Sequence, residues 1–114
     1  MATEITVEAQ AAIDAVKANG IKVFKTTFNA GADTFYIRQI SRLEYKNLAA
    51  NLAQITDQTT RMALHEEKVA ELGVVFPKVT PEFISRSGAG FITVIADEIL
   101  RLSGFTQDIA TEEV

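Results

Sequence analysis

Apolar residues near the start of the chain recur at the spacing of an amphipathic helix. Within residues 6–20, apolar positions repeat every three or four residues, so that they share one helical face. These positions are Ala9, Ala12, Ile13 and Val16. Gly20 follows them, and glycine readily adopts the left-handed conformation that ends many helices. The pattern therefore predicts a first helix closed by Gly20.

The next two segments have the composition of β-strands. Residues 21–28 and 34–40 are rich in β-branched and aromatic side chains, and a short stretch of small and polar residues between them indicates a turn. Side chains alternate between the two faces of a strand, so Phe24, Thr26 and Phe28 share one face. Because that face carries two aromatic rings, we expect it to be covered. The two segments predict a β-hairpin.

Two helices are predicted after the hairpin, and the boundary between them stays open. Ser41 and Glu44 have the spacing of a capping box, in which each side chain accepts a hydrogen bond from the other residue's backbone N–H. The apolar stripe that follows continues to about residue 57. A second stripe predicts another helix closed by Gly73. Its apolar positions are Met62, Val69 and Leu72. The weak helix formers at residues 57–60 are compatible with a break or with one continuous helix.

The last part of the chain predicts a short helix and a longer one. Thr80 and Pro81 combine a capping hydroxyl with a proline suited to the first helical turn, which predicts a short helix over residues 81–85. After a glycine-containing turn, a strong apolar stripe predicts a helix that ends at Ser103 and Gly104. The apolar positions of this stripe are Phe91, Ile92, Ile95, Ile99 and Leu102.

Together these elements predict a single α+β domain over residues 1–105. We expect an N-terminal helix, a β-hairpin and then three to four helices packed around one core. Residues 106–114 contain three acidic and few apolar side chains, so we expect a flexible acidic C-terminal tail. The 114 residues of the chain match the size of one domain, and a composition that is 47% apolar is sufficient for a buried core.

Composition also argues against several classes of partner. The net charge is −4, which offers no basic face to a nucleic acid. The longest largely apolar stretch, residues 89–96, is far shorter than the ~20 residues that cross a bilayer, so we expect no membrane partner. The absence of cysteine excludes disulfides and thiolate chemistry. The first residues lack the apolar segment of a secretion signal, so we expect the mature chain to begin at Met1.

Few side chains in the sequence are suited to catalysis. His65 is the only histidine, and it begins a segment like the helical zinc-protease motif, but Val69 stands where the second ligand is needed. Gly88 and Gly90 make a weak phosphate-loop signal, because no lysine follows the second glycine. The serines lack a partner base, and the paired carboxylates are adjacent residues that point in different directions on a helix. We therefore predict that the protein is not an enzyme, with no catalytic residue, no cofactor and no metal.

Aromatic residues are the more informative candidates. The chain has seven phenylalanines and two tyrosines, and aromatic side chains dominate both protein cores and binding hot spots. We name Phe76, Phe83 and Phe105 as candidate partner-binding residues, since Phe76 and Phe83 lie in an apolar connection and Phe105 follows the last helix. Ordinary burial preferences favour the alternative, in which these rings belong to the core.

The order of several short motifs resembles the small tail assembly chaperones of long-tailed bacteriophages and related small baseplate or tail-assembly proteins. The resemblance covers about residues 34–105. In chain order the motifs are Thr34-Phe35-Tyr36-Ile37-Arg38-Gln39-Ile40, Ser41-Arg42-Leu43-Glu44-Tyr45, Glu67-Lys68-Val69, Gly73-Val74-Val75-Phe76-Pro77, Ala89-Gly90-Phe91 and Leu102-Ser103-Gly104-Phe105. The sequence Ser-Gly-Ala-Gly stands where those proteins are expected to have a proline-led turn.

The resemblance implies a protein that acts by binding. Such chaperones hold the tape-measure protein or another tail component transiently and keep it soluble in the host cell cytoplasm until the tail assembles. The alternative is a permanent structural component of a tail or baseplate, which would remain in the virion. A homo-oligomer is also compatible with the sequence, because the stripe of the last helix can pack between subunits as well as within one.

Overall fold

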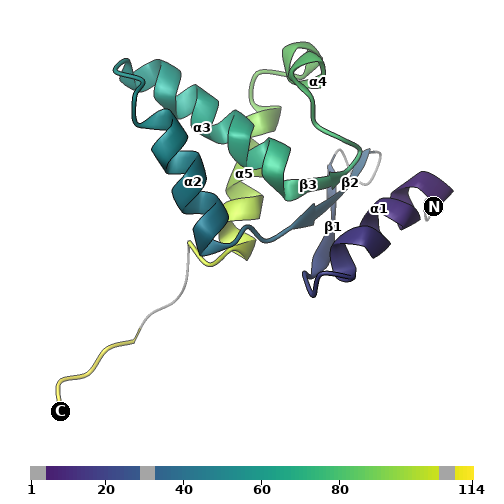
Figure 1. Ribbon diagram of the computed structural model, residues 1–114, viewed down its shortest axis with the longest axis horizontal. Helices are drawn as coiled ribbons and strands as arrows, with labels where there is room; N and C mark the ends of the chain where they lie inside the picture. The colour runs from purple at the N-terminus through teal and green to yellow at the C-terminus, as the bar shows by residue number, and fades with distance from the viewer. Residues whose placement is uncertain (1–4, 29–32, 106–109) are drawn as a thin grey trace.

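The computed structural model describes residues 5–28, 33–105 and 110–114 of the chain. Three strands form one sheet, and the helices lie around it (Figure 1). The elements are α1 (Val7–Lys17), β1 (Val23–Phe28), β2 (Asp33–Arg38), α2 (Arg42–Leu52), α3 (Gln58–Gly73), β3 (Val74–Phe76), α4 (Pro81–Arg86) and α5 (Phe91–Leu102). The predicted α+β fold, with an N-terminal helix, a hairpin and further helices, is confirmed. Most of the predicted hairpin turn lies outside the described residues.

The predicted helix caps are present. The Ser41 hydroxyl accepts a hydrogen bond from the Glu44 backbone N–H at 3.1 Å, and the Glu44 carboxylate accepts one from the Ser41 N–H at 2.9 Å. Gly20 adopts the predicted left-handed conformation, with φ of 77°, just after α1 ends at Lys17. Thr80 caps α4, and its hydroxyl accepts from the Phe83 N–H at 3.1 Å.

The second and third helices are separate, which decides between the two alternatives that the sequence left open. The second helix is shorter than predicted: its apolar stripe continues to about residue 57, but α2 ends at Leu52. Asp57 then caps α3, and its carboxylate accepts a hydrogen bond from the Thr60 backbone N–H at 3.0 Å. A side chain that satisfies the free N–H groups of a new helix start favours a break over one continuous helix.

The sheet contains one strand that the sequence did not indicate. The strands are antiparallel in the order β1-β2-β3, and β3 pairs Val74 with Ile37 and Phe76 with Tyr36. Residues 74–76 were expected to be a connection. Three residues are too few to show an alternating pattern, so the pairing partner β2 is what makes this segment a strand.

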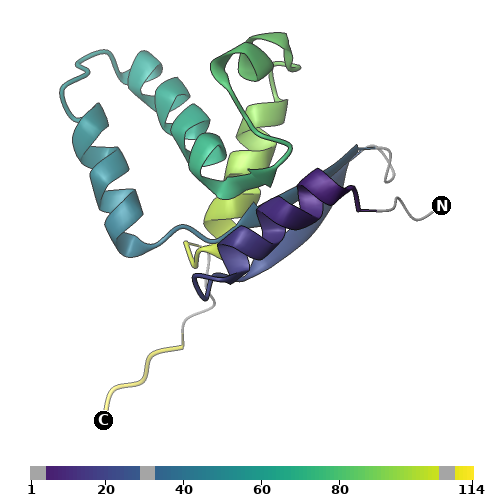
Figure 2. The same ribbon diagram turned by 45° about the vertical axis from the view of Figure 1, so that its right-hand side comes forward.

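The two faces of the sheet are covered by different helices. On one face α1 packs on a small cluster formed by Ala9, Ile13 and Tyr36. Figure 2 shows α1 lying along the sheet, with the remaining helices on its other side. The predicted covering of Phe24 and Phe28 is confirmed, since both pack against the main cluster on that second face.

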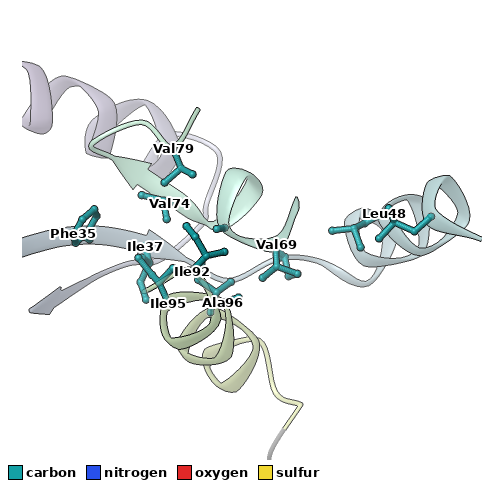
Figure 3. Close-up of a cluster of buried hydrophobic side chains, with 13 residues drawn as sticks. Phe35, Ile37, Leu48, Val69, Val74, Val79, Ile92, Ile95 and Ala96 are labelled. Carbon is teal, nitrogen blue, oxygen red and sulfur yellow. The ribbon is translucent and has the colours of Figure 1, made fainter. Parts of the chain in front are cut away.

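The main cluster joins the sheet to α5 and α3. Its completely buried side chains, which have no exposed surface, are Ile37, Val69, Ala70, Ile95 and Ile99. In Figure 3, Val69 lies between the α5 side chains and Leu48, which stands apart on α2. The helix α2 therefore packs on the outer side of α3, and only α3 separates it from α5. None of the helices in the described parts of the chain is long and apolar enough to span a bilayer.

Candidate functional site: an apolar cleft beside α3

The structure separates the three aromatic residues that the sequence named as partner-binding. Phe76 packs against the small cluster beneath α1, whereas Phe83 packs with the main cluster on the opposite face of the sheet. The Phe83 ring makes edge contacts with Phe35 and Phe91, at centroid distances of 6.2 and 6.0 Å. Phe76 and Phe83 therefore do not line a common groove. Phe105 is different, because 48% of its surface is exposed.

The inward face of α3 is uncovered near the start of the helix. Met62 and Val69 are seven residues apart and thus lie on the same side of the helix. Val69 is completely buried, yet Met62 is 59% exposed. The same face that is core near the sheet is open to solvent two turns earlier, so α2 and α5 do not close over it there.

A cleft of about 440 Å³ occupies this position. Ala49 and Leu52 form the wall on α2, and Ala96 and Leu100 form the wall on α5. The floor is α3, with Met62 and His65. Alanines on both walls keep the cleft wide at the level of the backbone, because they fill little of it.

A row of rings lies beside the cleft. The rings of Tyr45 and Phe105 are 4.7 Å apart between centroids, and the Tyr45 ring makes an edge contact with His65 at 5.7 Å. His65 Nε2 lies 3.3 Å from the Tyr45 hydroxyl, within hydrogen-bond distance. The only histidine is thus half-buried and has a partner from α2, and Val69, at the position that a zinc-protease motif needs for its second histidine, is in the core.

The polar groups that line the cleft are largely engaged within the protein. The Arg61 guanidinium donates to the Ile55 carbonyl at 3.1 Å, and the Glu66 carboxylate accepts from the Thr93 hydroxyl at 2.7 Å. No group of three or more side chains suited to a metal ion occurs within the described ranges. Asp97 also lines the cleft and makes no hydrogen bond or ion pair with any residue that the structure describes. The cleft therefore presents an apolar surface bordered by engaged polar groups and one free carboxylate, which suits recognition of a mainly apolar segment.

An ion pair and two hydrogen bonds hold the start of α2 in place. The Arg38 guanidinium contacts both Glu44 carboxylate oxygens, at 3.0 and 2.5 Å. Hydrogen bonding from Arg38 lowers the pKa of Glu44 from 4.5 to about 2. Gln39 donates to the Leu102 carbonyl at 2.6 Å, and the Ile40 N–H donates to the Ser103 hydroxyl at 2.9 Å. These contacts fix the base of α2 against the end of α5, and thereby the width of the cleft.

Comparison of the chain with protein-family models, curated proteins and solved structures finds no match. What the cleft can bind is therefore inferred from its geometry and its lining residues alone. The sequence placed Met62 in the apolar stripe of a predicted helix and did not identify Ala49, Ala96 or Leu100 as lining residues. The only hint of a cleft in the sequence was the pair of small residues at positions 49 and 96. Small residues line a cleft only if the helices that carry them lie apart, and the distance between α2 and α5 cannot be read from the sequence.

Proposed function

We propose that this protein is a phage tail assembly chaperone that acts without catalysis. It holds an apolar helical segment of a tail component, such as the tape-measure protein, in the cleft between α2, α3 and α5. The observation that carries the proposal is the exposure of Met62 on the face of α3 that is completely buried at Val69. An apolar helix laid against such a face buries its own stripe in the same way that α2 and α5 bury theirs.

The side chains of the cleft support reversible holding. Methionine is flexible and polarisable, so Met62 adapts to differently shaped apolar partners. The half-buried Tyr45 and the exposed Phe105 add aromatic surface beside it, and aromatic side chains are common anchors in interfaces. His65 is engaged with Tyr45, and within the described residues it makes no hydrogen bond to Glu66 or Asp97, the two carboxylates that line the cleft.

The test is co-expression with the tape-measure protein of the phage that encodes the chain. We expect the tape-measure protein to stay soluble and to co-purify with this protein. Met62→Asp places a charge in the cleft and should weaken the complex by about tenfold or more, because the carboxylate loses water when the partner binds. Leu43→Asp is the matched control, since Leu43 is 66% exposed on α2 outside the cleft.

Three results would contradict the proposal. Equal binding by the Met62→Asp and Leu43→Asp variants would exclude the cleft. Turnover that is lost on replacing His65 would exclude a purely binding role. Detection of the protein at a fixed copy number in purified particles, by mass spectrometry, would favour the alternative of a structural component of the tail or baseplate, because a chaperone is absent from the virion.

A further inference from the structure

The strand β1 presents a free edge. It lies at the end of the sheet, and its only strand partner in the described parts of the chain is β2, which pairs with all six of its residues from Val23 to Phe28. The N–H and C=O groups on the other side of an edge strand are available to a further extended chain. The chemistry of this edge therefore selects a strand and not a helix.

A groove runs beside this edge. It has a volume of about 810 Å³ and lies between β1 and α5. Its apolar lining includes Phe28 of β1, Val94 and Leu100 of α5, and Phe105. Val94 is 53% exposed although it stands on the strongly apolar helix α5. An added strand would place alternate side chains over this groove, because every second side chain of a strand points to the same face.

The groove also carries an unpaired negative charge. Asp97 projects from α5 and makes no hydrogen bond or ion pair with any residue that the structure describes. The nearby cation is already engaged, because the Arg101 guanidinium donates to both Glu98 carboxylate oxygens at 2.6 and 2.9 Å. A lysine or arginine on the incoming strand would complement Asp97.

We propose that β1 and α5 together bind an extended segment of a partner protein, which adds to the sheet as a fourth strand. The segment carries apolar side chains at alternate positions and a lysine or arginine among them. A second copy of β1 fits less well, because the face that it would turn toward α5 consists of Phe24, Thr26 and Phe28. That face has no cation for Asp97. This groove shares Asp97 and Leu100 with the cleft at Met62 and is otherwise lined by different residues, and the proposal does not depend on the function proposed for that cleft.

The test uses a synthetic peptide, acetyl-Ser-Val-Ser-Lys-Ser-Val-Ser-amide, which places Val, Lys and Val on one face of a strand. Titration into the ¹⁵N-labelled protein should shift the backbone amide signals of β1 and slow their hydrogen exchange. A peptide with Glu in place of Lys should bind about tenfold more weakly. In the Asp97→Lys variant the preference should reverse. The uncharged variant Met62→Ala should change neither affinity, because Met62 does not line this groove.

The charge reversal makes the result decisive. Equal affinity for the Lys and Glu peptides, in the wild-type protein and in Asp97→Lys, would overturn the proposal. So would amide shifts that fall outside β1 and α5. Light scattering that shows a dimer whose β1 amides are already protected from exchange would assign the edge to a second copy and would also overturn it. Circular dichroism of Asp97→Lys provides the control for folding, because Asp97 is exposed.

Discussion

Gly73 sits where the last turn of α3 touches α5, and this contact gives the sharpest prediction for stability. A methyl group at position 73 would lie 2.5, 2.6 and 2.9 Å from three side-chain carbons of Ile99. Carbon atoms pack favourably at about 3.5–4.0 Å, so all three contacts would be repulsive. Ile99 is completely buried and has little room to move away.

We expect Gly73→Ala to lower the free energy of unfolding by about 1–3 kcal/mol, the usual cost of overpacking a core. Urea denaturation followed by circular dichroism measures this change. Gly90→Ala is the matched control, since a methyl group at Gly90 meets nothing within 4 Å and its φ is −91°. Gly90 is the N-cap of α5, where alanine is less favourable than glycine, but alanine also restricts the unfolded chain, so that variant should change the free energy of unfolding by less than about 1 kcal/mol.

A double-mutant cycle tests whether contact with Ile99 causes the loss of stability in Gly73→Ala. Ile99→Ala removes the three carbons that a methyl group at Gly73 would meet, so in that background Gly73→Ala should cost less than about 0.5 kcal/mol. The reasoning is refuted if Gly73→Ala is as benign as Gly90→Ala. It is also refuted if the cost of Gly73→Ala is the same with Ile99 present and absent, because the strain would then arise elsewhere.

Two further predictions follow from contacts in the main body of the fold. The pKa of Glu44 is lowered in the folded state to about 2, so its ion pair with Arg38 stabilises the protein above pH 4.5 and this contribution is lost as the pH falls toward 2. After allowance for solvent screening we expect about 1–2 kcal/mol, and acid titration of the unfolding free energy should show no such loss in Glu44→Gln. Phe91 makes ring contacts with three other phenylalanines, at centroid distances of 5.3, 5.1 and 6.0 Å, so Phe91→Leu should cost about 1–3 kcal/mol in urea denaturation. Phe105→Leu should cost less than about 1 kcal/mol, because among the described residues its ring contacts only that of Tyr45. An equal cost for the two variants would contradict this account.

Elements with a complete local signal were predictable from the sequence. The capping box at Ser41 and Glu44 predicts where α2 begins, because both of its hydrogen bonds form within four residues of the chain. The hairpin is similar, since its two strands are adjacent in sequence and their alternating residues pair without help from distant parts. The stripe of α5 is long enough for its period to be unambiguous.

The tertiary structure alone decided β3 and the two surfaces that we propose to bind partners. Val74 and Phe76 form a strand because β2 lies beside them, and no pattern within three residues contains that information. The same holds for Phe76 and Phe83, which are close in sequence but pack on opposite faces of the sheet. Met62 and Val69 lie on the same face of α3, yet Met62 is exposed and Val69 is buried. Hydrophobic periodicity predicts which face of a helix points inward, but it does not predict how far the neighbouring helices extend along that face.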